Sequence, residues 1–295
     1  MNEQSAKTGR EVQRRKQSNL KGVWKRMKKN KAALLGFYII ILLVLCAVFA
    51  EQIAPYGPDK QSLRNRFRFP CREFPMGTDN LGRDILSRVI YGSRISLQIG
   101  VVAVGIAATF GVILGAIAGY SGIIVDNIIM RAVDITLSIP SILLAIAIAA
   151  AMGEGMFSLM LAVGVSEIPN YARVTRAQVL SLRGQEFIEA TRAIGASDFR
   201  IIFVHILPNC FAPLIVQSTL GVARAIIAAS ALSFIGLGIQ PPTPEWGAML
   251  SAGRQYIRDY WYIVIFPGLM IMITIYALNL FGDGLRDALD PRLKN

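Results

Sequence analysis

Long apolar runs separated by short polar segments fill most of this chain. A helix needs about 20 residues to cross a bilayer core that is about 30 Å thick. Five uncharged runs of that order cover residues 32–50, 95–125, 135–153, 206–223 and 260–282. A sixth run, 155–166, reaches spanning length only by including Glu167 and continuing toward Tyr171. The pattern therefore predicts six membrane-spanning helices, of which the fourth is the weakest.

The apolar runs do not alternate with a period of two, as the strands of a membrane β-barrel would. In lipid, only helices and closed barrels satisfy the whole backbone. The composition agrees, because 54% of the 295 residues are hydrophobic and only 17% are charged. We therefore expect an all-α integral membrane protein of a cytoplasmic (inner) membrane.

Positive charge gathers at the N-terminus. Residues 1–31 contain eleven Lys or Arg against only Glu3 and Glu11. A basic run can bind nucleic acid, but positive residues before a first span are typical of a segment held in the cytoplasm. We therefore expect no nucleic-acid partner. An even number of spans would place the 285–295 tail in the cytoplasm as well.

The first apolar run could also belong to a signal peptide, because Val48 and Ala50 suit a cleavage site. The run in 32–50 is longer than the apolar core of about 7–15 residues in such peptides. We interpret 32–50 as a retained first helix.

Segment 51–94 is the longest predicted loop and lies on the outer side in this topology. Its basic residues are unusual for an outer loop, since positive charge favours the cytoplasm. Near its end, Ile85, Leu86, Val89 and Ile90 share one helical face. This pattern predicts an interfacial helix before the second span, and a five-helix membrane domain over 95–284.

Small residues and prolines shape the predicted spans. Gly111, Gly115 and Gly119 form two overlapping G-x-x-x-G units in the second span, which predict close contact with another helix. Pro140 lies in the third span and Pro169 near the end of the fourth, so both predict kinks.

Motifs for catalysis are missing from the chain. It has one histidine, His205, and it lacks the phosphate-binding P-loop, the G-x-S-x-G elbow and C-x-x-C. Its three cysteines, Cys46, Cys71 and Cys210, have no paired spacing, so neither a disulfide framework nor a metal site is expected. The chain is expected neither to catalyse a reaction nor to bind ATP.

The polar segment 181–208 lies between the fourth and fifth spans and is predicted to be cytoplasmic. Residues 185–194 have the pattern of a short helix with an acidic first turn. Phe187, Ile188 and Ile194 have no lipid to enter there. They either pack on the protein's own helices or enter a groove of a partner.

Three residues predict how this segment turns back to the membrane. Gly195 suits the left-handed position after a helix, and Ser197 can cap a second short helix. Pro208 suits the opening turn of the fifth span, where a missing N–H does no harm. The expected arrangement is helix, sharp turn, helix, span.

The sequence Glu189-Ala190-Thr191, followed by Gly195 and by Leu207-Pro208, resembles the EAA loop of bacterial binding-protein-dependent ABC importers. In that family the loop is a coupling helix that sits in a cleft of the ATPase subunit. The family usually has Ala where this chain has Thr191. The resemblance implies an ATPase-coupling surface made of Glu186, Phe187, Glu189, Ala190, Thr191, Gly195 and Pro208.

Segments 76–97, 232–250 and 279–293 resemble the C-type permeases of dipeptide and oligopeptide (peptide/nickel) importers. The resemblance implies the type I ABC importer permease (MetI-like) fold. It also implies a heterodimer with a B-type permease, two ATPase subunits that bind ATP and Mg, and an extracytoplasmic binding protein. This chain itself would bind no cofactor.

Two ionisable residues, Glu167 and Arg224, lie inside predicted spans. Such groups are costly in hydrocarbon and usually face a cavity or a partner. They either line the translocation pathway, where a zwitterionic peptide would meet both charges, or pair structurally or reach the interface.

The loop after the fifth span carries Pro241, Pro242, Glu245 and Trp246, and its prolines make it stiff. On the outer side, this loop could dock the binding protein, or it could plug or brace an outer gate.

Peptides are the expected cargo, with nickel or other metal complexes and glutathione as alternatives. An ATP-independent secondary transporter is a different class. The coupling-type loop and the lack of an inverted repeat argue against that class. The missing catalytic motifs argue against an intramembrane enzyme.

Overall fold

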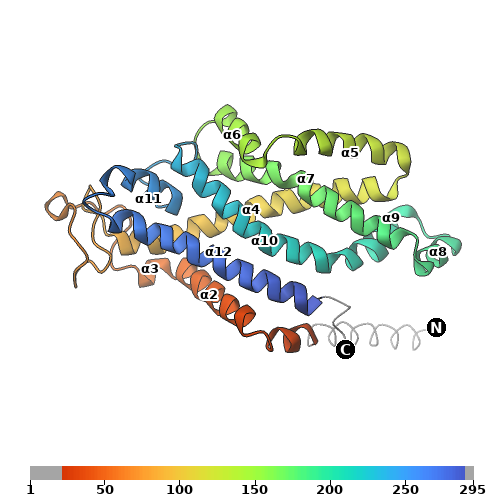
Figure 1. Ribbon diagram of the computed structural model, residues 1–295, viewed down its shortest axis with the longest axis horizontal. Coiled ribbons are helices and arrows are strands. Elements are labelled where there is room, and N and C mark those ends of the chain that lie inside the picture. Colours follow the sequence, from red (N-terminus) through yellow and green to blue (C-terminus); the bar gives the residue numbers. More distant parts are fainter. Residues whose placement is uncertain (1–21, 290–295) are drawn as a thin grey trace.

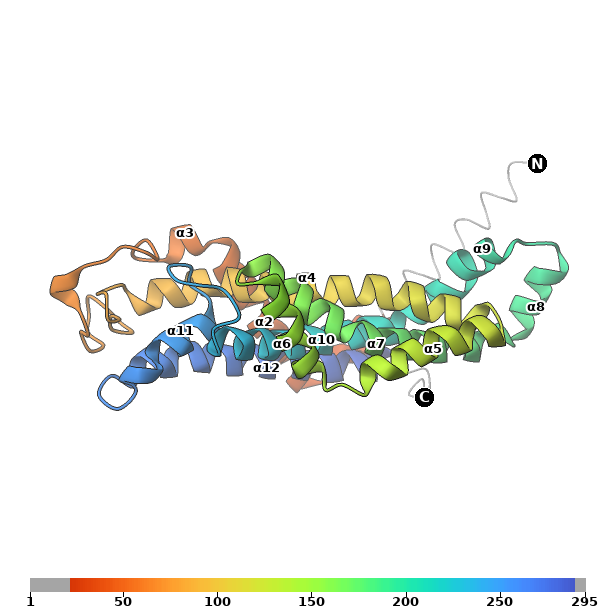
Figure 2. The same cartoon turned by 90° about the horizontal axis from the view of Figure 1, so that it is seen from above.

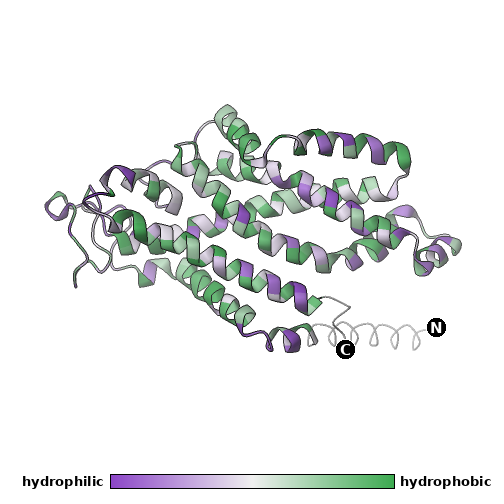
Figure 3. Cartoon of the chain, in the orientation of Figure 1, coloured by the Kyte–Doolittle hydropathy of each residue, from purple (hydrophilic) through white to green (hydrophobic). Residues whose placement is uncertain are grey.

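A computed structural model describes residues 22–289, and the parts of the two predicted tails at 1–21 and 290–295 lie outside the described residues. Every regular element in this range is helical. The long helices lie side by side in an elongated bundle, with loops at its two ends (Figures 1 and 2). Hydrophobic residues follow the middle of the bundle and hydrophilic ones gather toward its ends (Figure 3).

The first span is α2 (Lys31–Val48), followed by the short α3 (Ala50–Ile53). Asn30 starts α2, because its side-chain oxygen accepts hydrogen bonds from the N–H groups of Ala32 and Ala33. The following loop contains one 3₁₀ turn, η1 (Leu63–Asn65).

The second span, α4 (Ile85–Tyr120), is longer than predicted. Asp84 caps it by accepting a 2.8 Å hydrogen bond from the N–H of Ser87. The separate interfacial helix expected before the span is wrong, because residues 85–94 form the first turns of α4 itself. With 36 residues, α4 measures about 54 Å at ~1.5 Å per residue, longer than the bilayer core. Its first turns pack against neighbouring loops, which satisfy their polar groups.

The third span contains a sharp break and not the kink predicted at Pro140. It consists of α5 (Ile123–Leu137) and α6 (Ser141–Met152), which meet at 86° around Pro140. Gly122, with a φ of 95°, separates α4 from α5. Residues 123–125 therefore belong to the third element and not to the second.

The fourth span is α7 (Met156–Arg183), and the prediction that it ends near Pro169 is wrong. The helix continues through this proline to Arg183, as membrane helices can when neighbouring groups satisfy the backbone carbonyl that the proline leaves free. It lies at the centre of the bundle, in contact with α4, α5, α6 and the later α10. This enclosed position explains how so polar a helix fits the fold.

The predicted close approach through the glycines of α4 is confirmed, and the partner is α7. A Cβ added to Gly111 would collide with the side chain of Tyr171, and one on Gly119 would lie 2.8 Å from the Cβ of Val179. The backbones of α4 and α7 are therefore so close at these positions that a residue larger than glycine does not fit.

The predicted cytoplasmic segment forms α8 (Glu186–Ala193) and α9 (Asp198–Arg200). The remaining elements are a π-helical stretch η2 (Ile201–Ile206), α10 (Leu207–Phe234), α11 (Trp246–Gly253), η3 (Arg254–Tyr256) and α12 (Tyr262–Leu289). From α9 to the end of α10 the helix is continuous, so the second short helix and the fifth span are one rod of 37 residues.

Within residues 22–289, four helices are long and apolar enough to cross a membrane: α2, α4, the α9–α10 rod and α12. The bent pair α5 and α6 gives a fifth if it counts as one span. The 28-residue α7 is long but more polar, so the count of six stays a prediction. Neither predicted domain boundary marks a break, because α4 runs through 94/95 and α12 through 284/285.

Candidate functional site

The helix α8 projects from one end of the bundle, beyond the ends of α4 and α7 (Figures 1 and 2). Of its three apolar residues singled out above, Ile188 is fully buried against the protein's own core. Phe187 is 40% exposed and Ile194, just after the helix, is 84% exposed. One residue thus anchors α8 to the bundle while two remain available to a partner.

The turn after α8 has the predicted chemistry. Gly195 has a φ of 85°, and its N–H donates to the carbonyl of Arg192 while that of Ala196 donates to the carbonyl of Thr191. This is the Schellman pattern, which closes a helix with a left-handed residue. An added Cβ at Gly195 would meet no atom within 4 Å. The constraint at this position is therefore in the backbone and not in packing.

Beyond the turn, Ser197 caps the next helix as predicted, accepting a hydrogen bond from the N–H of Arg200. Pro208 lies in the first turn of α10, but the helix already runs through η2, so the proline does not open the span. The turn at Gly195 is thus joined to the membrane by an uninterrupted helix. A π-helical stretch inside a helix is often found at functional sites.

A polar latch ties this segment to the end of α4. The hydroxyl of Tyr120 donates a 2.6 Å hydrogen bond to the Asp198 carboxylate and accepts one of 3.1 Å from Arg192. The hydroxyl raises the pKa of Arg192 above its usual value through that bond. We call Tyr120, Arg192 and Asp198 the latch. It joins α8 and the start of α9 to the end of α4 by side-chain hydrogen bonds.

Glu167 of α7 and Arg224 of α10 are brought together by the fold. Their nearest oxygen and nitrogen lie 3.7 Å apart, and Asn170 donates a further hydrogen bond to Glu167. The Glu167 side chain is largely buried and that of Arg224 is 43% exposed. The two charges compensate each other, which lowers the cost of placing both inside a membrane domain.

This ion pair lines a cavity of about 290 Å³ between α6, α7 and α10, whose wall also includes Ser141 and Ser166. A second cavity, of about 490 Å³, lies between α7, α10 and α12 and includes Gln178 and Asn209. Most of the residues of α7 and α10 that line the two cavities lie three, four or seven positions apart, as residues on one helical face do. Both cavities therefore lie along one face of the α7–α10 pair.

The outer-loop residues Glu245 and Trp246 are buried, with exposures of 1% and 0%. The Glu245 carboxylate accepts hydrogen bonds from the N–H groups of Gly247 and Ala248, both 2.8 Å long. Burial raises the pKa of Glu245, and these two bonds oppose the shift. The indole of Trp246 donates to the carbonyl of Val89 in α4. Pro241 and Pro242, in contrast, are exposed.

Comparison with known families places this chain. Residues 111–295 match the family model of the binding-protein-dependent transport system inner membrane component. Residues 18–70 match the N-terminal transmembrane domain of oligopeptide transport permease C.

The chain belongs to this permease family.

Two relatives cover nearly the whole length. The di/tripeptide transport system permease of Pseudomonas aeruginosa is 47% identical, over 94% of both chains. The dipeptide transport system permease of Alkalihalophilus pseudofirmus is 48% identical, over 92% of this chain and 90% of the relative. Among solved structures, the inward-facing MetNI methionine ABC transporter matches with a TM-score of 0.57 and 19% identity, over 70% of this chain and 98% of that one. This match supports the MetI-like fold.

Family membership makes this permease the membrane component of an ABC importer and not an enzyme, with ATP hydrolysis on partner ATPases and a second permease beside it. The expected family and fold class are confirmed. The latch was missed, since it joins residues that are far apart in sequence. The only local signal for the latch was a tyrosine near the end of the uncharged run 95–125. Structural pairing of Glu167 and Arg224 was one of the alternatives that the sequence left open, and the fold brings the two together.

Proposed function

We propose that this permease forms half of the pathway for dipeptides or oligopeptides in an ABC importer, and that α8 receives the force from the ATPase. The observation that carries the proposal is how α8 is held. Ile188 and the latch attach it to the bundle, while Phe187 and Ile194 remain exposed to a partner. The names of the relatives, which transport di- and tripeptides, support the cargo.

The proposed coupling surface keeps the residues inferred from the sequence: Glu186, Phe187, Glu189, Ala190, Thr191, Gly195 and Pro208, with Ile194 added by its exposure. ATP and Mg would be bound by two ATPase subunits that hold α8 in their clefts. The start of α2 and the end of α12 point toward the end that carries α8 (Figure 1). In this arrangement both termini would be cytoplasmic.

Glu167 and Arg224 are proposed to line the pathway. Their cavity is large enough for part of a small peptide, and together they present one acidic and one basic group. A peptide could place its ammonium group against Glu167 and its carboxylate against Arg224. Each charge would then still have a partner while the peptide passes.

At the opposite end, Glu245 and Trp246 are proposed to brace the outer loops. Their burial leaves them no surface to offer a docked protein. Pro241 and Pro242 remain available for the extracytoplasmic binding protein.

The test is uptake by the complete importer in proteoliposomes, with the companion permease, both ATPases and the binding protein. The expected result is ATP-dependent uptake of a labelled dipeptide that unlabelled peptides compete away. Competition by nickel complexes or by glutathione, with none by peptides, would overturn the proposed cargo. Uptake without ATP would overturn the proposed coupling.

A further inference from the structure

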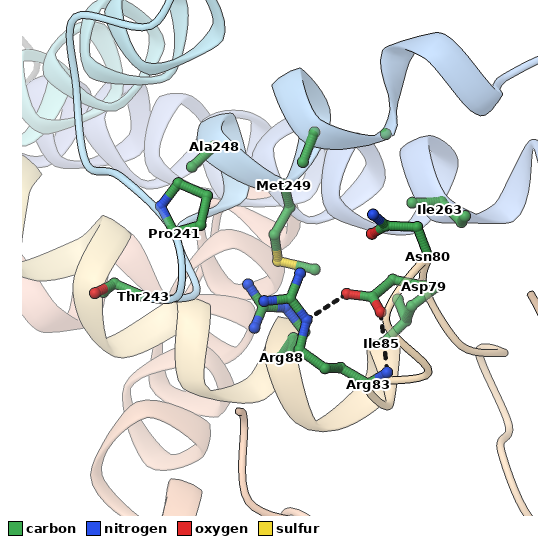
Figure 4. Close-up of a pocket in the computed structure, with 12 residues that line it drawn as sticks. Asp79, Asn80, Arg83, Ile85, Arg88, Pro241, Thr243, Ala248, Met249 and Ile263 are labelled. Atoms are coloured by element: carbon green, nitrogen blue, oxygen red, sulfur yellow. Dashed lines mark hydrogen bonds and ion pairs between the residues drawn. The ribbon is translucent and has the colours of Figure 1, made fainter. Parts of the chain in front are cut away.

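An arginine-lined pocket opens between the loop before α4 and the helix α11, away from the cavities described above (Figure 4). Its polar lining comes from Asp79, Asn80, Arg83, Arg88 and Thr243. Asp79, Arg83 and Arg88 are each about 95% buried, while Pro241 and Ala252 on its rim are exposed. The pocket therefore has a charged floor and an accessible mouth.

The two arginines differ in how their donors are used. Arg88 donates to the carbonyls of Pro58 and Pro242 and pairs with Asp59 at 3.3 Å. Arg83 pairs with Asp79 through its Nε alone, at 2.6 Å. Neither Nη nitrogen of Arg83 makes a hydrogen bond within residues 22–289. A buried guanidinium with unused donors at a pocket is suited to a carboxylate, which it can bind in a two-pronged manner.

The size of the pocket limits what can enter it. Its volume is about 30 Å³, and a single water needs about 10–15 Å³ on such a measure. A carboxylate group fits, but the body of a peptide or of a lipid headgroup does not. The rest of the ligand must remain outside the mouth, as it does when a side chain projects from a folded surface.

The surroundings favour an acidic partner. Segment 51–94, which forms one wall, carries eight basic residues against five acidic ones. The helix α11, which forms one wall of the pocket, lies at the end of the molecule opposite α8 (Figures 1 and 2), which is the outer side in the proposed function. We propose that this pocket receives an acidic side chain of the extracytoplasmic binding protein when that protein docks. The proposal rests on the proposed function, because it needs a binding protein on that side.

The test uses the complete importer in proteoliposomes and measures ATP hydrolysis against the concentration of purified binding protein, relative to each variant's own basal rate. Arg83→Gln is expected to raise the half-maximal concentration by about tenfold or more, since the carboxylate loses a charged, two-pronged donor. The control, Arg72→Gln, removes the same charge from an exposed position in the same loop and should shift it by less than about twofold.

A second pair of variants leaves the arginines untouched. Ala252→Glu places a carboxylate on the rim, where it would occupy the pocket from within the chain and raise the half-maximal concentration. Ala252→Gln has the same size without the charge and should have a much smaller effect. Because Ala252 is exposed, neither variant threatens folding.

The outcomes separate the two proposals. If the unmodified importer is not stimulated by its binding protein, the proposed function fails. If it is stimulated but Arg83→Gln and Arg72→Gln behave alike, or Ala252→Glu and Ala252→Gln behave alike, the pocket does not receive the binding protein. If Arg83→Gln changes only the concentration of peptide needed at saturating binding protein, the carboxylate comes from the cargo and the proposal is overturned.

Discussion

The two ends of this permease differ in how they place their large and charged side chains. At the outer end, Trp246 and Tyr262 are fully buried, and the charged Arg83 and Glu245 are enclosed with partners for their charge or hydrogen bonds. At the α8 end, large apolar residues face outward: Ile194 is 84% exposed and Phe199 is 71% exposed.

This difference is one of degree, because the outer end also exposes Leu63 at 68% and Phe69 at 53%. Most of the large buried side chains at the outer end find partners within the chain, apart from the Nη nitrogens of Arg83, so these residues contribute first to the stability of the fold. The α8 end is held by Ile188 and the latch but leaves its apolar surface open, as expected for a segment that is completed by another subunit. Substitutions at the first end should therefore lower stability, and those at the second should lower coupling.

The largest effect on stability is expected for Trp246→Ala. This change removes a fully buried indole and its hydrogen bond to Val89, which should cost about 3–5 kcal/mol. The matched control is Trp261→Ala, at a tryptophan that is 47% exposed and should cost far less. Thermal unfolding of the purified protein in detergent measures both. Equal losses would mean that the outer end is not the stabilised one.

Glu167→Gln lies between the two ends and should affect transport strongly. It leaves Arg224 without its counter-charge, so we expect uptake to fall by about tenfold. Glu154→Gln, in an exposed loop, should leave uptake unchanged. Adding Arg224→Gln should restore membrane abundance without restoring peptide uptake. Full uptake by the double variant would remove the pair from the pathway.

Tyr120→Phe should have a smaller effect that is confined to coupling. It removes the hydroxyl that joins Arg192 to Asp198, at a cost of about 1 kcal/mol. We expect a rise of about threefold in the ATP hydrolysed per peptide imported, with only the small loss of thermal stability that about 1 kcal/mol gives. Tyr276→Phe, at a tyrosine that is 57% exposed in α12, is the control. A loss of stability without a change in the ratio would make the latch merely structural.

The smallest effect concerns pH at the outer end. Burial holds the pKa of Glu245 above its ordinary value of 4.5, so the folded state holds this proton more tightly than the unfolded state. The resulting stability is fully present below the ordinary value and is lost as the pH rises through the raised pKa. Unfolding temperatures measured across this range should fall as pH rises, and Glu245→Gln should flatten the curve. A curve of unchanged slope in Glu245→Gln would assign the dependence to another group.

Features that depend on residues close together in the sequence could be predicted from it, and features that join distant residues could not. The turn at Gly195 and the cap at Ser197 involve neighbours a few residues away, so their residue types alone predict them. The glycines of α4 predicted a close helix–helix contact, but they did not identify α7 as the partner. Tyr120 and Asp198 are 78 positions apart, and no local pattern joins them.

The prolines show why residue type alone does not predict where a helix breaks. Pro140 accompanies a bend of 86° while Pro169 lies inside an unbroken helix. Pro213 and Pro267 likewise lie inside unbroken helices, so the residue type alone does not decide whether a helix is interrupted. The polar α7 was the weakest predicted span because its apolar run had to include Glu167. The pairing of Glu167 with Arg224, which makes the charge tolerable there, could not be derived from the local sequence.

The most direct test of the account compares Gly195→Val with Gly184→Val in the reconstituted importer, measuring ATP hydrolysed per peptide imported. Both glycines have open space around them, but only Gly195 has a positive φ. A β-branched residue at Gly195 therefore strains the turn by about 1–3 kcal/mol and should uncouple hydrolysis from uptake at normal membrane abundance. Gly184→Val should keep the unmodified ratio. Normal uptake and an unchanged ratio in Gly195→Val would contradict the claim that α8 carries the force of the ATPase.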